Sequence, residues 1–210
     1  MKHVICNLFS QPVTLTEVNV EGIADFFENT IKPNVKGCSE GKSQIHLTNY
    51  HNTENIFELY DELKPLGQEI LSACNFVYQE ILNYDSDLRF TNAWINESEV
   101  GGEQGLHNHC NSALSGTVYL RTDENTNIEF PNRFTTSDTV CQLTDDPNQE
   151  RENKFGHYYH KDTATFTVQT GYCMIWPSYL KHGYSENKTP RRLSLSFNTL
   201  PNHLNCLYKL

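Results

Sequence analysis

Phe90-Thr91-Asn92-Ala93-Trp94-Ile95-Asn96 is the stretch at which the side-chain pattern of this chain changes to a period of two. Successive side chains of a strand point to opposite faces, so this alternation predicts a β-strand. Five further short runs are rich in β-branched or aromatic residues and are separated by turn clusters: 113–121, 127–130, 163–168, 172–176 and 191–199. Many short strands of this kind predict a sandwich or barrel.

The part of the chain before this stretch has helical periodicity instead. Apolar residues recur at helical spacing over 20–31, up to Pro33, and over 54–82, where Pro65 is expected to kink or split the helix. The segment 33–52 is expected to be a loop. Apolar stripes on helices pack against a sheet. The prediction is one mainly β (α+β) domain over residues 1–210, with helical support at about 1–87 and a β core at about 88–200.

Composition restricts the possible partners and compartment. The chain has 16 Lys+Arg against 26 Asp+Glu, and this acidic balance makes a nucleic-acid partner improbable. No apolar run is long enough to cross a membrane or to act as a signal peptide, so a membrane partner is not expected. The seven cysteines are odd in number and form no CxxC, which favours a reducing cytoplasm. The polar connection 132–162 is expected to be a lid or simply a mobile segment.

Histidines are the first candidates for chemistry. His107 and His109 follow a glycine-rich turn, and two residues at positions i and i+2 of a strand share a face. His182 follows the strand that ends at Pro177, so it could provide a third imidazole from a distant part of the chain. Neutral imidazole is a common ligand of iron, zinc, copper and nickel. The three residues therefore predict a metal site.

Arg192 and Ser194 predict a second half of the same site. They lie two residues apart, so they share one face of a strand. A guanidinium beside a hydroxyl can hold a carboxylate in a β core. Because facing sheets lie about 10 Å apart, a metal on one wall and Arg192 on the other could span a small dicarboxylate.

Five motifs then stand in a recognisable order: His107-x-His109, Ser115-Gly116-x-x-Tyr119-Leu120, Trp176-Pro177-Ser178, Leu180-x-His182 and Arg192-x-Ser194-x-Ser196-Phe197-Asn198. Together they resemble the 2OG-Fe(II) oxygenase family that is abundant in phages, over roughly residues 92–199. The resemblance implies a double-stranded β-helix, or jelly-roll, core with the N-terminal helices packed on one sheet.

The resemblance also implies an activity and its residues. Enzymes of this type bind Fe(II) and 2-oxoglutarate, use O2 to hydroxylate or otherwise oxidise a second substrate, and release succinate and CO2. By position, His107 and His182 would be catalytic iron ligands. Arg192 and Ser194 would hold the cosubstrate, with Tyr119 as a further contact. A cytoplasmic enzyme, in the host cytoplasm if the gene belongs to a phage, is expected.

One position departs from the usual pattern. Most such enzymes have H-x-D, whereas this chain has His109 at the carboxylate position. Either the site has three histidines, or a water, Glu103 or Asp123 completes it. Two alternatives stay open: a cupin-like three-histidine metal enzyme without 2-oxoglutarate, and a non-catalytic jelly-roll binding module or virion component. The expected substrate is a small molecule or a peptide, of unknown identity, and the oligomeric state is undetermined.

Overall fold

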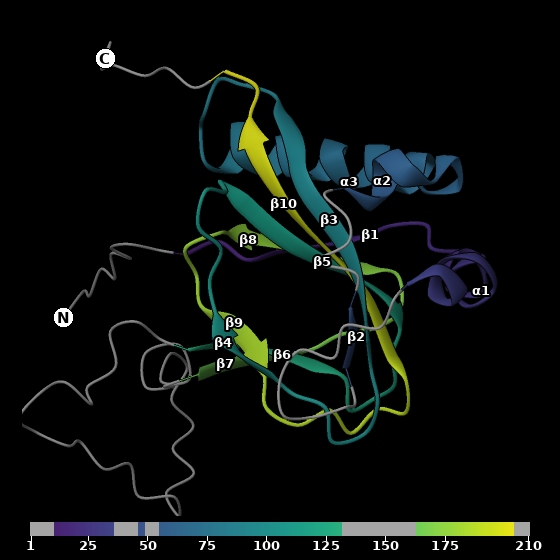
Figure 1. Cartoon of the computed structure of the whole chain (residues 1–210). Helices are drawn as coiled ribbons and strands as arrows, with labels where there is room; N and C mark the ends of the chain where they lie inside the picture. The colour runs from purple at the N-terminus through teal and green to yellow at the C-terminus, as the bar shows by residue number, and fades with distance from the viewer. Residues whose placement is uncertain (1–10, 36–45, 49–54, 132–162, 204–210) are drawn as a thin grey trace, which may run out of the picture.

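The computed structural model describes residues 11–35, 46–48, 55–131 and 163–203. Two antiparallel sheets make up most of this part and face each other (Figure 1). The larger sheet has the order β1-β8-β5-β10-β3-β2 and the smaller one the order β4-β9-β6-β7. The predicted mainly β fold with a jelly-roll core is therefore confirmed, whereas the division into a helical support and a β core within one domain stays a prediction.

The larger sheet contains the longest strands. Its members are β1 (Thr14–Glu17), β2 (His46–Thr48), β3 (Leu88–Ser98), β5 (Leu114–Arg121), β8 (Tyr172–Pro177) and β10 (Arg192–Pro201). The smaller sheet consists of β4 (Gln104–His107), β6 (Asn127–Pro131), β7 (Thr163–Thr167) and β9 (His182–Tyr184). All six strands expected from periodicity are present, and four short strands of three or four residues each are additional: β1, β2, β4 and β9.

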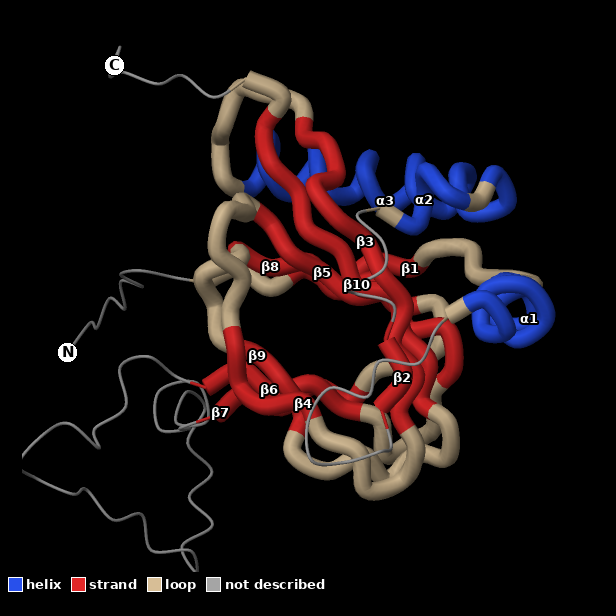
Figure 2. The backbone as a smooth tube through the Cα atoms, in the orientation of Figure 1, coloured by secondary structure: helices blue, strands red, loops and turns tan. Residues whose placement is uncertain are grey.

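The helices lie on the outer face of the larger sheet (Figure 2). They comprise α1 (Ile23–Phe26), η1 (Phe27–Ile31), η2 (Lys32–Asn34), α2 (Ile56–Leu59), η3 (Asp61–Leu63), α3 (Lys64–Phe76) and η4 (Val77–Ile81). In the part of the chain that is described, no helix is long and apolar enough to cross a membrane.

The second helical region is split in two, as expected, whereas the first continues past the proline that was expected to end it. The second helical region breaks at Tyr60, which has an extended backbone, and Pro65 lies in the first turn of α3. Pro33 likewise lies inside the single turn of η2, and the helical path ends only at Val35. At the start of a helical turn the missing N–H of proline has no partner to lose, so proline begins a turn there instead of ending one.

Strand β10 shows how the fold separates its two cores. Leu193, Leu195 and Phe197 are fully buried in the cluster between the sheet and the helices. The alternate residues Arg192 and Ser194 line a pocket between the two sheets instead. The strand thus presents apolar side chains to the helices and polar side chains to the interior of the jelly roll. The connection 132–162 lies outside the described residues, so its role stays open.

Candidate metal centre

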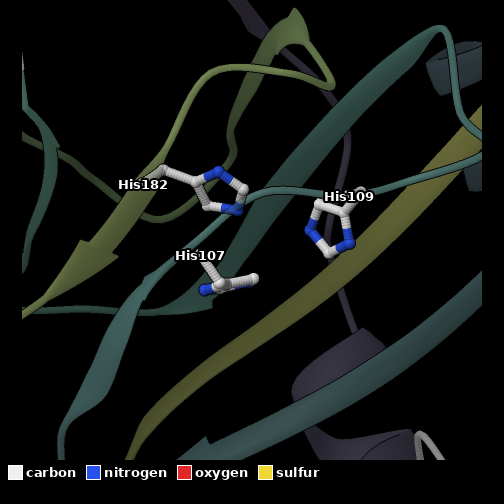
Figure 3. Close-up of side chains that lie close together, drawn as sticks. All are labelled: His107, His109 and His182. Atoms are coloured by element: carbon white, nitrogen blue, oxygen red, sulfur yellow. The ribbon is translucent and has the colours of Figure 1, made fainter. Parts of the chain in front are cut away.

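Three imidazoles, those of His107, His109 and His182, lie close together and line one pocket (Figure 3). His107 ends β4, His182 begins β9, and the two are paired across these antiparallel strands. His109 follows β4 and is fixed by its backbone N–H, which donates to the carbonyl of Ser178 at 3.0 Å. One nitrogen from each ring lies within 4.8 Å of the other two. The sequence prediction that these histidines converge is met, although His109 lies beyond the strand and not on it.

Two of the three rings are held in the tautomer that metal binding requires. The Nδ1 of His107 lies 2.9 Å from the carbonyl of Gly105, and the Nδ1 of His182 lies 3.0 Å from the carbonyl of Leu180. A carbonyl only accepts, so Nδ1 carries the hydrogen and Nε2 keeps its lone pair. This arrangement orients metal-binding histidines in many proteins.

Burial keeps two of the imidazoles uncharged. Burial is the main cause, and together with a smaller effect of the neighbouring histidines it lowers the pKa of His109 to about 4 and that of His182 to about 3. The ring of Trp176 lies 4.6 Å from that of His182 and contributes to this dry environment. A metal ligand must be neutral imidazole, so both residues are ready to bind without losing a proton at neutral pH.

No carboxylate joins this group in the described part of the chain. The converging donor atoms belong to His107, His109 and His182 alone. Asp123 is occupied elsewhere, because its Oδ1 accepts from the Thr189 hydroxyl at 2.6 Å, and that hydrogen bond is the main cause of its lowered pKa. Glu103 is exposed. Of the alternatives considered from the sequence, the geometry favours the three-histidine set.

Arg192, Ser194 and Tyr119 form the second half of the same pocket, which the three histidines also line. All three are buried, and Ser194 is paired with Tyr119 across β10 and β5. The Arg192 Nη1 donates to the carbonyl of Asn127 at 2.9 Å. Burial raises the pKa of Tyr119 to about 12, against the opposing effect of the Arg192 charge. The cation and the hydroxyl expected from the sequence are thus placed together.

Buried polar atoms without partners indicate that this pocket is shaped for a ligand. Within the described residues, the Arg192 Nε, the Tyr119 hydroxyl and the Trp176 Nε1 make no hydrogen bond. Leaving such atoms unpaired costs about 1–3 kcal/mol each, so folded proteins rarely retain them without a function. A carboxylate group accepts hydrogen bonds, so one carboxylate in the pocket could pair with both the Arg192 Nε and the Tyr119 hydroxyl.

Sequence reasoning missed two residues that shape the pocket. Trp176 belongs to a recognised motif, and its inward position on β8 could have been inferred from the alternation of that strand. Tyr184 stacks on Arg192, with the guanidinium carbon 3.8 Å from the ring centre. It lies two residues after His182, so it shares that residue's face of β9, but a three-residue strand shows no period in the sequence.

A family model described as 2OG-Fe(II) oxygenase matches residues 92–198, slightly more than half of the chain. The matched range contains the three histidines and both Arg192 and Ser194. No curated protein matches the sequence.

Solved structures of similar shape share little sequence with this chain. The epimerase SnoN, solved with Fe3+, alpha ketoglutarate and nogalamycin RO, has a TM-score of 0.61 at 12% identity, covering 91% of this chain and 79% of its own. HygX from Streptomyces hygroscopicus, solved with nickel and 2-oxoglutarate, has a TM-score of 0.57 at 10% identity, covering 92% and 84%. OsALKBH1 has a TM-score of 0.54 at 12% identity, covering 91% and 100%. At such identities the similarity establishes the fold.

Proposed function

Because this chain belongs to the 2OG-Fe(II) oxygenase family, we propose that it is an Fe(II)- and 2-oxoglutarate-dependent dioxygenase that hydroxylates a second substrate. In that reaction one oxygen atom of O2 enters succinate and the other enters the product, while 2-oxoglutarate loses CO2. The observation that carries the proposal is a single pocket with three converging imidazoles and, in the same pocket, a buried guanidinium with an unpaired Nε.

The three histidines fit a first-row transition metal. Their donor set is neutral nitrogen throughout, which suits iron and nickel, and oxygen-preferring magnesium or calcium would be poorly served. We propose that His107, His109 and His182 hold Fe(II), whose role when bound is to support oxidation by O2. A neutral imidazole in place of a carboxylate makes the net charge of the metal and its three protein ligands more positive by one elementary charge.

Arg192, Ser194 and Tyr119 are proposed to hold the far carboxylate of 2-oxoglutarate. Arg192 is 4% exposed, so its charge acts in a medium with little water to screen it. The unpaired Nε of Arg192 and the unpaired hydroxyl of Tyr119 are two donors for the same carboxylate. Binding would thereby replace two unsatisfied groups with charge-assisted hydrogen bonds.

The second substrate is proposed to be a small molecule or a peptide. The net charge of -10 disfavours a polyanion such as nucleic acid. The cytoplasm is the proposed compartment, since the cysteines show no paired spacing. The substrate class can be tested by incubating the protein with cell extract and identifying the hydroxylated products. The proposal would be contradicted if a nucleic acid were hydroxylated and no peptide or metabolite were.

The three-histidine set is also the donor set of cupin-like metal enzymes that do not use 2-oxoglutarate. Such an enzyme would need the histidines but would have no use for a buried Arg192. Both functions predict that the protein binds a metal. Only the proposed dioxygenase predicts that it also binds 2-oxoglutarate.

The test is an anaerobic titration of the Fe(II)-loaded protein with 2-oxoglutarate, read by the visible charge-transfer absorption that chelation produces, followed by succinate analysis after O2 is admitted. A band that is lost in His182→Ala and weakened in Arg192→Ala is expected. Metal retention without the band or succinate would favour the cupin-like function. No retained metal would leave only a non-catalytic role.

A further inference from the structure

His109 differs from the other two histidines in the group that contacts its Nδ1. His107 and His182 each face a backbone carbonyl, whereas the Nδ1 of His109 lies 3.4 Å from the side-chain Nδ2 of Asn198. Asn198 is 5% exposed and lies on β10, where it is paired with Ser115 of β5. The third imidazole is therefore oriented by a side chain from the opposite sheet.

A chain of buried hydroxyls continues from Asn198. The Ser115 hydroxyl donates to the Asn198 Oδ1 at 2.6 Å and lies 2.8 Å from the Ser178 hydroxyl. Ser178 in turn donates to Ser112 at 2.8 Å, and Ser112 donates to the carbonyl of Leu114 at 3.0 Å. Every member of the chain thus has a polar neighbour on each side.

The amide of Asn198 has two orientations, and they have opposite consequences for metal binding. With Nδ2 toward His109, Nδ1 must accept, so the neutral ring carries its hydrogen on Nε2 and has no lone pair there for a metal. A rotation of the amide by 180° places Oδ1 against Nδ1 and makes Nδ1–H the donor. Nε2, which points toward the other two imidazoles in Figure 3, is then free to bind.

The hydroxyl chain accepts the rotated amide without loss of a hydrogen bond. Nδ2 would donate to Ser115, Ser115 to Ser178, Ser178 to Ser112, and Ser112 to the Leu114 carbonyl. The last three of these contacts are already present in the structure. Only the hydrogen of Ser115 changes its acceptor, from Asn198 to Ser178.

We propose that Asn198 is the positioning residue of His109, and that rotation of its amide along the Ser115–Ser178–Ser112 chain makes His109 able to bind the metal. The inference rests on the proposed function, since it explains how a histidine can serve at the position where relatives have a carboxylate. Asn198 is not among the residues that line the pocket, so its proposed role is exerted through His109.

The first experiment measures the affinity of the metal-free protein for Ni(II) by calorimetry, together with the visible spectrum of the Co(II) form. Asn198→Leu, which has no acceptor for Nδ1–H, is expected to bind about 10-fold to 100-fold more weakly. Asn198→Asp keeps an acceptor and is expected to retain wild-type affinity or exceed it. Asn92→Leu is the matched control. Asn92 lies on β3, directly opposite Asn198 of β10, and no contact between Asn92 and His109 is found among the described residues.

If Asn198→Leu bound Ni(II) with wild-type affinity, the inference would be overturned. Equal losses of Ni(II) affinity in Asn198→Leu and Asn198→Asp would also overturn it, because they would indicate that Asn198 has a structural role only. A second measurement uses the wild-type protein, so its result does not depend on whether a variant folds. In the Zn(II)-loaded wild type, nitrogen-15 NMR of the histidine side chains should show a protonated Nδ1 and a metal-bound Nε2 for His109. A metal-bound Nδ1 at His109 would also overturn the inference.

Failure of the proposed function gives a different pattern. Metal binding that needs His182 but not Asn198 overturns the inference alone. Metal binding that needs both, without chelation of 2-oxoglutarate, overturns the proposed function and leaves the inference standing. Absence of metal binding in the wild type overturns both.

Discussion

Arg192 stacks on Tyr184, with 3.8 Å between the guanidinium carbon and the ring centre, and this contact joins the two sheets of the jelly roll. Arg192 begins β10 in the larger sheet, and Tyr184 ends β9 in the smaller one. The Nη1 of the same guanidinium donates to the carbonyl of Asn127 in β6. The plane of the cation is thus fixed from two sides, which leaves the unpaired Nε available to a ligand.

We expect Arg192→Lys to weaken 2-oxoglutarate binding by about tenfold to 100-fold, although the charge is kept. An ammonium group cannot stack flat on Tyr184 or offer two parallel hydrogen bonds to a carboxylate. Titration of the Fe(II) protein, read by its charge-transfer absorption, measures the change. An affinity equal to that of the wild type would show that the charge alone is sufficient.

The adjacent Arg191 provides the control, because it points away from the pocket. Arg191 has a positive φ of 56°, and its side chain forms ion pairs with Glu28 and Glu97, with Nη2 3.0 Å from Glu97 Oε1. Arg191→Lys should leave 2-oxoglutarate affinity unchanged and cost at most about 1 kcal/mol of stability, since Arg191 is half exposed.

Tyr119→Phe is expected to separate stability from cosubstrate binding. The Tyr119 hydroxyl is buried and unpaired in the described structure, so its removal should leave the metal-free protein as stable as the wild type, or more stable. The same change removes a donor for the carboxylate and should weaken 2-oxoglutarate binding by roughly fivefold, which corresponds to about 1 kcal/mol. Thermal unfolding and calorimetry measure the two effects. A large loss of stability would instead indicate that the hydroxyl has a structural partner.

The inner surface of β10 could be predicted from the sequence because alternation is a local property. Apolar Leu193 and Leu195 require the helix side, so Arg192 and Ser194 are placed in the interior by the period of two. The convergence of the histidines could be suspected only from their type and the order of the motifs. It depends on the pairing of His107 with His182, which no local pattern encodes.

Strands β4 and β9 could not be predicted, since four and three residues are too short to show a period. Their hydrogen bonds, and not their sequence, define them as strands. The same limit applies to Asn198, whose place in a motif was visible but whose contact with His109 depends on the approach of two sheets. The end of the first helical region could not be predicted for a different reason, because Pro33 was treated as a terminator although it lies at the start of the turn of η2.

The metal-free protein is predicted to lose stability as the pH falls from 7 to 5. The pKa of His182 is lowered to about 3 by burial, whereas the unfolded residue has a pKa of about 6.5. Between these values the unfolded state binds the proton and the folded state does not, so acid favours unfolding. His182 alone should contribute about 2 kcal/mol by pH 5, and His109, with a pKa of about 4, acts in the same direction.

Urea unfolding in the presence of a chelator at pH 7, 6 and 5 measures this dependence. His182→Leu has no imidazole to protonate, so its stability should fall less steeply over the same range. Equal slopes for the variant and the wild type would show that His182 is not kept neutral by the fold.

Gly183→Ala is expected to damage the metal centre through the backbone of the smaller sheet. A Cβ at Gly183 would lie 2.5 Å from the carbonyl oxygen of Gln104, so β4 and β9 would have to move apart. These are the strands that bring His107 and His182 together, and their separation should weaken Ni(II) binding and cost about 1–3 kcal/mol of stability. Gly105→Ala is the matched control, because a Cβ there meets nothing within 4 Å. Equal Ni(II) affinities for the two variants would mean that the close approach of β4 and β9 does not set the metal site.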